Sequence, residues 1–163
     1  MGDYDTAQIC LNGHVANDSF HRFPQFNKNF CQLCGEPTII KCEKCNAPIR
    51  GYYHTPGVIG VGAGEGDKTS AGFCYNCGHA YPWTERRLKA ARELADEFDS
   101  LTEAEREKLK QSLDDLVREG PATEIAVVRF KKIMNKVGRE SYDMMKSIIT
   151  DILSETAKKT LLG

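Results

Sequence analysis

Apolar residues recur at helical spacing only in the second half of this 163-residue chain. Thr84 is expected to cap the first helix of that half. Thr102 with Glu105 forms a capping box for the second helix, which Gly120–Pro121 ends. The period predicts helices over about 84–98, 102–119, 124–137 and 141–161. Short connections between such helices favour an antiparallel bundle of about four helices.

The last of these helices is predicted to run without interruption from about Ser141 to Leu161. One face of it carries six residues at helical spacing: Tyr142, Met145, Ile149, Ile152, Leu153 and Thr156. A stripe of this width can be buried against the other helices of a small bundle. The helical half is therefore expected to have a hydrophobic core of its own.

Residues 1–83 lack this period, and their apolar residues are sparse. Short β-type runs at 38–40 and 49–53 predict strands of small hairpins. These few apolar groups can form only a weak hydrophobic core. A bound metal must therefore replace much of the stabilisation that a larger core would give. The pattern predicts a small α+β protein with two domains, 1–83 and 84–163.

All seven cysteines of the chain lie in the first domain, and a histidine completes a set of eight candidate metal ligands. They form four half-sites, C-L-N-G-H, C-Q-L-C, C-E-K-C and C-Y-N-C. The ligands are Cys10, His14, Cys31, Cys34, Cys42, Cys45, Cys74 and Cys77. A spacing of two residues lets one tight turn direct both sulfurs at one ion, and thiolate with imidazole is a ligand set that zinc prefers. We therefore predict two structural Zn²⁺ ions.

Four half-sites in a row can pair sequentially or interleave as in a cross-brace domain. The first two half-sites match a short ribbon that needs no help from the rest of the chain. The connection from Cys34 to Cys42 is long enough to pass from one ribbon to the next. We therefore predict sequential pairing, which gives two tandem zinc ribbons with a Cys₃His site and a Cys₄ site. Gly35 and Gly78 provide the turn after their half-sites, and Asn46 takes the same place in the third.

Composition excludes several classes of protein. The net charge is −1, and the sequence contains no apolar run long enough for a membrane span and no signal peptide. Cysteines arranged as metal ligands favour a reducing compartment, so we expect a cytoplasmic protein. The glycine-rich stretch 56–66 superficially resembles a dinucleotide loop, but the next zinc half-site follows too closely for the helix that such a loop requires.

One charged feature stands out in the third predicted helix. Between Ile125 and Arg139 the sequence has five basic residues and no acidic one. Four of them fall within an arc of about 80° on a single helix: Arg129, Lys132, Lys136 and Arg139. They are candidate contacts for phosphates or for an acidic partner. We prefer a solvated face, because residues 85–163 hold 16 basic and 16 acidic side chains.

Five stretches spread over nearly the whole chain form a specific combination. They are DTAQICLNGHV, FCQLCGEPTI, IRGYYHTPGV, FCYNCGHAYPWTE and SETAKKTLLG. In this combination the chain resembles an uncharacterised bacterial family of small cytosolic double zinc-ribbon proteins, a domain of unknown function. The resemblance implies zinc and a bacterial cytosol, and it implies no activity.

The favoured hypothesis for function is a non-enzymatic adaptor or scaffold that acts through protein–protein interaction. Four protein ligands close each zinc site, no nucleophile stands in a recognisable triad, and every cysteine serves as a ligand. The partner would be another protein, or a second copy bound through the helical domain.

Two other hypotheses remain open. A nucleic-acid-binding regulator would use the basic helix 125–139. Against it, residues 1–84 carry six basic and seven acidic side chains, and two zinc ions on seven thiolates add three further negative charges. Rubredoxin-like electron transfer is the less favoured hypothesis, with iron in the tetrahedral S₄ site of Cys42, Cys45, Cys74 and Cys77.

Overall fold

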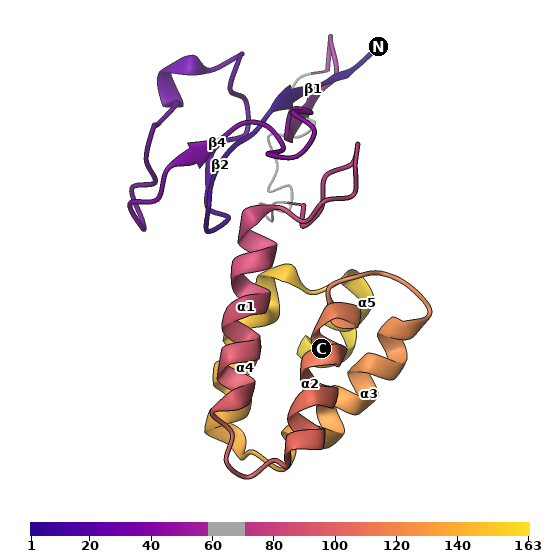
Figure 1. Ribbon diagram of the computed structural model, residues 1–163. Helices are drawn as coiled ribbons and strands as arrows, with labels where there is room; N and C mark the ends of the chain where they lie inside the picture. Colours follow the sequence, from indigo (N-terminus) through magenta and orange to yellow (C-terminus); the bar gives the residue numbers. More distant parts are fainter. Residues whose placement is uncertain (59–70) are drawn as a thin grey trace. The chain divides into compact units, whose positions relative to one another are not determined.

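The computed structural model describes residues 1–58 and 71–163. The chain divides into two compact units, Met1–Thr84 and Glu85–Gly163 (Figure 1). The predicted small α+β class is confirmed, with short antiparallel strands in the first unit and five α-helices in the described residues. No helix in the described ranges is long and apolar enough to cross a membrane. Residues 59–66 of the glycine-rich stretch lie outside the described residues.

Short antiparallel strands build two small sheets in the described part of the first unit. In one sheet β1 pairs with β5, and in the other the order is β3-β2-β4. The bounds are β1 Asp3–Thr6, β2 Gln8–Cys10, β3 Val15–Asn17, β4 Thr38–Ile39 and β5 Arg50–His54. Strands β4 and β5 match the runs predicted at 38–40 and 49–53. The other three have no run of β-type residues that would identify them.

One hydrophobic core is shared by the segments that carry both pairs of half-sites. Its buried members are Ala7, Ile9, Cys42, Ile49, Cys74, Tyr81 and Trp83. The backbone N–H of Ala7 donates to the carbonyl of Ile49 at 2.8 Å, just where β1 and β5 begin to pair. The rings of Tyr81 and Trp83 stack with centroids 4.6 Å apart. The first ribbon is therefore less independent of the second than its sequence indicates.

The five α-helices begin close to where the sequence predicts, with one correction at the first. Their bounds are α1 Pro82–Asp96, α2 Glu103–Leu116, α3 Ala122–Met134, α4 Arg139–Ile149 and α5 Glu155–Leu162. The predicted capping box is confirmed, because Thr102 and Glu105 each accept a hydrogen bond from the other's backbone N–H. Thr84 is not the cap of α1. Proline favours the first turn of a helix, so α1 begins at Pro82, and the buried Thr84 hydroxyl donates to the carbonyl of Gly72 at 2.9 Å.

The second unit buries the apolar faces of its helices against one another. Helix α2 packs against α3, and α5 packs against α3 as well (Figure 1). Leu109, Leu113 and Leu116 of α2 are fully buried, as are Phe130 and Met134 of α3. The Arg87 side chain of α1 donates to the carbonyl of Ile148 in α4 at 3.0 Å. The three leucines of α2 stand at helical spacing in the sequence and form the buried face of this helix.

The prediction of one continuous helix from Ser141 to Leu161 is wrong. Helix α4 ends at Ile149, a short 3₁₀ turn η2 covers Thr150–Ile152, and α5 begins at Glu155. Leu153 is extended, and the Ser154 side chain caps α5 by accepting from the N–H of Ala157 at 3.3 Å. Ile152 and Leu153 remain buried within the break, as do Ile149 before it and Ala157 after it. The apolar stripe continues through the break, so periodicity alone does not reveal it.

Replacing Ser154 by alanine is expected to lower the free energy of unfolding of the helical unit by about 1 kcal/mol, the usual effect of losing a side-chain cap. Ser147→Ala is the matched control, since Ser147 is exposed within α4 and alanine favours a helix interior. Urea unfolding followed by circular dichroism measures both. Equal stability of the two variants would contradict the assignment of Ser154 as a cap.

Candidate metal centres

Three of the four half-sites have the same backbone turn, which begins at Cys31, Cys42 or Cys74. The N–H of each of these cysteines donates at 2.8 Å to the carbonyl five residues later, in Glu36, Ala47 and His79. The residue four positions after each cysteine donates back to the carbonyl of that cysteine at 2.8–2.9 Å. Such a turn needs a positive φ, which is 75° at Gly35, 61° at Asn46 and 71° at Gly78. Asparagine thus takes the glycine conformation in the third half-site.

The first half-site reaches the same result with a different turn. Gly13 has a φ of 91°, and its N–H donates to the carbonyl of Cys10 at 2.9 Å. A Cβ atom at Gly13 would lie 3.0 Å from the Cβ of Trp83. Glycine is therefore required here both by the backbone conformation and by the close approach of the core tryptophan. The turn brings the ring of His14 back toward Cys10.

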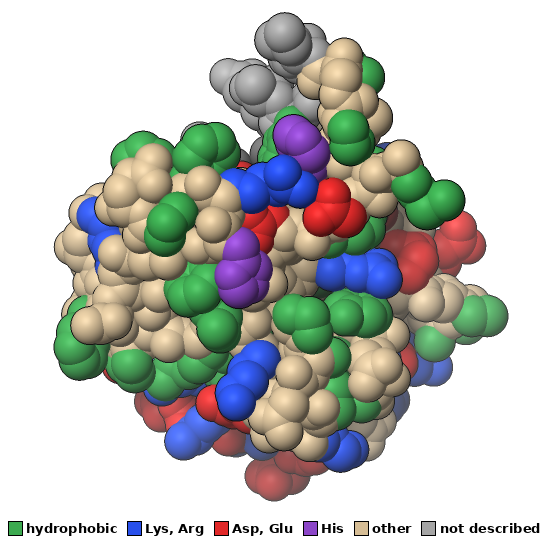
Figure 2. Space-filling model, turned by 90° about the horizontal axis from the view of Figure 1, so that it is seen from above, with side chains coloured by type: hydrophobic (Ala, Val, Ile, Leu, Met, Phe, Trp, Pro, Cys, Tyr) green, Lys and Arg blue, Asp and Glu red, His purple; other side chains and the backbone are tan. Residues whose placement is uncertain are grey.

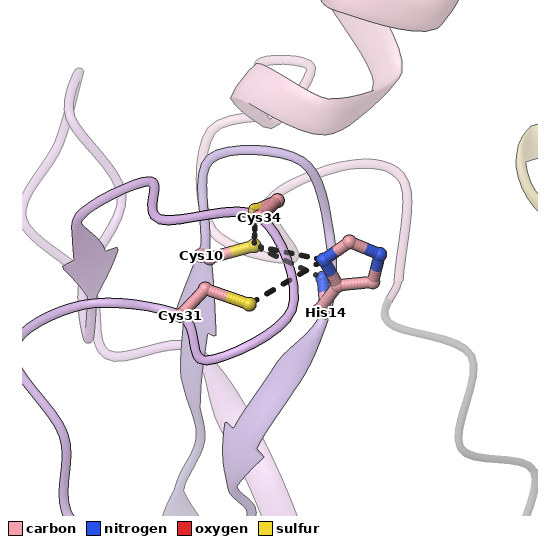
Figure 3. Close-up of side chains that lie close together, drawn as sticks. All are labelled: Cys10, His14, Cys31 and Cys34. Atoms are coloured by element: carbon pink, nitrogen blue, oxygen red, sulfur yellow. Dashed lines mark hydrogen bonds between the residues drawn. The ribbon is translucent and has the colours of Figure 1, made fainter.

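Cys10, His14, Cys31 and Cys34 converge on one point (Figure 3). His14 Nδ1 lies 3.5 Å from the Sγ atoms of both Cys10 and Cys31, and the Sγ atoms of Cys10 and Cys34 are 3.7 Å apart. In a tetrahedral site with zinc–sulfur bonds of about 2.3 Å, neighbouring sulfurs are about 3.8 Å apart. The distances in this cluster fit that geometry.

Cys42, Cys45, Cys74 and Cys77 form the second cluster. The Sγ atoms of Cys42 and Cys77 are 3.8 Å apart, and those of Cys45 and Cys74 are 3.6 Å apart. In both clusters all donor atoms lie within 4.8 Å of one another. The half-sites are therefore grouped sequentially, first with second and third with fourth, as the sequence predicts. Either cluster could hold a tetrahedral metal ion.

Hydrogen bonds to sulfur favour the thiolate forms that a metal requires. Burial would raise the pKa of Cys31, but the backbone N–H groups of Leu33 and Cys34 lower it to about 6. Cys74 follows the same pattern, and burial is outweighed by the N–H groups of Asn76 and Cys77, which bring its pKa to about 6. The side-chain amide of Asn76 also donates to Cys45 Sγ at 3.5 Å and lowers the pKa of Cys45. These hydrogen bonds thus favour the thiolate at Cys31, Cys45 and Cys74. Burial raises the pKa of Cys10, and the N–H of His79 is outweighed at Cys77 by burial and the neighbouring thiols, which raise its pKa to about 11.

Of the described histidines, His14 alone belongs to either cluster. His21, His54 and His79 are therefore not ligands in this arrangement. All eight residues of the two clusters are candidate metal ligands predicted from the sequence. What the sequence does not reveal is the Asn76 contact, because its target sulfur lies 31 positions earlier in the chain.

The four basic residues predicted to share one helix face do not share a helix. Helix α3 ends at Met134, and Arg139 begins α4 after Gly138, whose φ is 87°. Lys136 forms an ion pair with Glu105, and Arg139 Nε lies 4.0 Å from a carboxylate oxygen of Asp143. The predicted arc is therefore wrong. Arg129 and Lys132 remain on the exposed side of α3.

The fourfold replacement of Arg129, Lys132, Lys136 and Arg139 by glutamine is expected to leave stability nearly unchanged. All four side chains are exposed, and an exposed ion pair contributes less than about 1 kcal/mol. Thermal melting of the variant beside the native chain measures the effect. A fall in melting temperature of more than about 8 °C would correspond to a loss above about 1 kcal/mol and would show that these residues are structural.

Comparison with known proteins leads to one family. Neither the curated proteins nor the solved structures that were compared gave a match. A family model described as an uncharacterized protein conserved in bacteria (DUF2321) matches residues 3–161. The match extends through both metal clusters and the helical unit. The chain therefore belongs to this uncharacterised bacterial family.

Proposed function

We propose that the two clusters hold structural Zn²⁺ ions and that the protein is a non-enzymatic adaptor, which binds another protein. The closed donor sets carry this proposal, because each cluster has four protein donors within 4.8 Å of one another. A catalytic zinc site keeps one position for water or substrate, and four protein ligands occupy all positions of a tetrahedron. Zinc in these sites would fix the turns and would take no part in a reaction.

The ligand chemistry supports zinc over iron. A Cys₄ tetrahedron accepts either metal, so the second cluster alone does not discriminate. The first cluster places a histidine beside three cysteines at the distances of a tetrahedral site, and Cys₃His is a typical structural zinc set. Purification without added metal followed by elemental analysis tests this point. Zinc in a colourless protein is expected, and iron in a red protein would overturn the assignment.

Exposed aromatic and aliphatic side chains near the first cluster support a protein partner. Four large hydrophobic residues in this segment are at least half exposed: Phe23, Phe26, Phe30 and Leu33. Phe30 and Leu33 flank the ligand Cys31, so a metal would hold their backbone rigid. Figure 2 shows one face of the molecule, on which hydrophobic side chains stand among interspersed basic and acidic groups. Aromatic residues are enriched in protein interfaces, whereas nucleic acid requires a concentrated positive surface.

A pull-down from bacterial cytosol with the zinc-loaded protein tests the adaptor proposal. We expect at least one protein to be retained by the native chain and lost with the double variant Phe30→Ala, Leu33→Ala. The matched control is Ile125→Ala with Val128→Ala, two exposed hydrophobic residues of α3 in the other unit. Retention of nucleic acid alone would contradict the proposal, as would hydrolysis or redox turnover of added substrates by the purified protein.

A further inference from the structure

Two tyrosine rings contact one arginine on the surface of the first unit, and a third tyrosine packs against one of these rings. The guanidinium carbon of Arg50 lies 4.9 Å from the ring centroid of Tyr4 and 3.9 Å from that of Tyr75. The rings of Tyr4 and Tyr53 meet edge to face with centroids 4.8 Å apart. We call these four residues the tyrosine–arginine platform. Contacts of this kind hold a guanidinium in place through cation–π attraction.

The platform is exposed although its members pack on one another. The solvent-exposed fractions of Tyr4, Tyr53 and Tyr75 are 52%, 46% and 49%, and Arg50 is exposed as well. Within residues 1–58 and 71–163 no carboxylate forms an ion pair with Arg50, whereas Arg22 and Arg87 each have an aspartate partner. Two rings contact the guanidinium, and in the part of the chain that the structure describes its N–H groups donate to no side chain or carbonyl. The planar guanidinium of an arginine can donate two parallel hydrogen bonds to a carboxylate or a phosphate.

The position of each platform residue is fixed by the backbone. Tyr4 of β1 pairs with Tyr53 of β5, and Thr6 pairs with Arg50 in the same sheet. Tyr75 stands between the ligands Cys74 and Cys77, so the second cluster determines where this ring lies. The arginine is thus held by groups that are ordered before any partner arrives. Preorganisation of this kind reduces the entropy lost on binding.

We propose that the tyrosine–arginine platform binds an acidic side chain, Asp or Glu, in a peptide segment of a partner protein, with apolar neighbours of that side chain packing on the tyrosines. This inference rests on the proposed adaptor function and names the chemistry of the partner. Tyrosine and arginine, with tryptophan, are the residue types enriched at the energetic centres of protein interfaces. The platform therefore joins one charged contact to a surrounding aromatic surface.

Charge favours a single carboxylate over the phosphates of a nucleic acid. A zinc-loaded Cys₄ cluster carries a formal charge of −2 and is held by the half-site that presents Tyr75. With both ions bound, residues 1–84 have a formal charge near −4. Such a unit repels a chain of phosphates, but it accommodates one acidic group directed at Arg50. A single carboxylate is therefore the better ligand for the Arg50 guanidinium.

The test selects peptides that bind the zinc-loaded full-length protein from a phage library of random twelve-residue peptides. Peptides that also bind the Arg50→Gln variant are removed in a counter-selection step. The selected peptides are synthesised with their acidic residue and with the matching amide, Glu→Gln or Asp→Asn, and their dissociation constants are measured by fluorescence anisotropy. A charge-assisted hydrogen bond contributes about 1.5–3 kcal/mol, so we expect a loss of affinity of about tenfold or more for the amide peptide. Arg50→Gln should cause the same loss, and combining the two changes should add little.

Two further variants keep the test decisive. Arg50→Lys retains the charge but not the planar fork, so it is expected to bind weakly. Arg129→Gln removes an exposed arginine of the other unit and should bind normally. Zinc content of two ions per chain verifies that each variant is folded. Selected peptides without an acidic residue would overturn the inference, as would equal binding by Arg50→Gln, or an Arg50-dependent preference for a twelve-nucleotide oligothymidine.

The outcome is separable from that of the adaptor proposal. If a protein partner is captured equally well by the native chain and by Arg50→Gln, the platform inference fails and the adaptor proposal stands. If no protein is captured and the purified protein shows catalytic turnover, the adaptor proposal fails. The peptide measurement still decides whether the platform binds carboxylates.

Discussion

Removing zinc with a strong chelator is expected to unfold Met1–Thr84 and to leave the helices of Glu85–Gly163 in place. The first unit has a small core that itself includes two of the cysteine ligands, Cys42 and Cys74. Zinc binding contributes roughly 10–16 kcal/mol in small metal-folded domains, which is as large as the whole stability of a typical domain. The helical unit buries its own apolar faces and contains neither cluster.

Hydrogen exchange read by mass spectrometry distinguishes the two units in one experiment. Chelation should remove amide protection from strands β2 and β5, while peptides from α2 and α3 should remain protected. Restoring zinc should restore the pattern, which controls for irreversible aggregation. Unchanged protection of the strands without metal, or loss of protection in the helices together with the strands, would contradict the division into metal-dependent and metal-independent units.

Replacing Cys42 by serine is expected to have a much larger effect than replacing Cys34 by serine. Cys42 is fully buried and belongs to the shared core, whereas Cys34 is exposed at the edge of the first cluster. Loss of the second ion releases Cys42 and Cys74 from the packing around Ile9, Ile49 and Trp83. The first unit should then lose a contribution on the order of 10 kcal/mol and unfold in much of the population. Loss of the first ion is expected to leave this core packed, because none of the core residues is a ligand of the first cluster.

Tryptophan fluorescence measures the difference, because Trp83 is the one tryptophan of the chain and is buried in this core. The emission of Cys42→Ser should shift to the red, toward that of the chelator-treated protein, and that of Cys34→Ser should stay near native. Cys74→Ser provides a second variant of the same cluster and should behave like Cys42→Ser. The same emission maximum in Cys34→Ser and Cys42→Ser would show that the two clusters support the fold equally.

The candidate metal ligands could be predicted from the sequence because each half-site is local. Cys31 and Cys34 are brought together by one turn, and Gly35 marks that turn. The capping box at Thr102 is local in the same sense. Such features depend on residues within five positions of one another, so their pattern is visible without knowledge of the fold.

The features that the sequence does not reveal depend on distant residues or on competition between signals. The pairing of β1 with β5 joins Tyr4 to Tyr53 across the first three half-sites. The tyrosine–arginine platform adds Tyr75 from a third segment. At Ser154 a capping signal competes with an apolar stripe that continues on both sides, and the cap prevails. The prediction of one basic helix face was wrong because α3 ends at Met134, before Lys136 and Arg139.

The zinc content of half-site variants, measured by native mass spectrometry, tests the central claim most directly. The first variant removes Cys10 and His14, the second removes Cys31 and Cys34, and the third removes all four. The native chain should carry two zinc ions, and each of the three variants should carry one, because the four residues belong to a single cluster and the second cluster remains. A third variant without zinc, beside first and second variants that each retain one ion, would mean that the half-sites interleave and would contradict the sequential pairing.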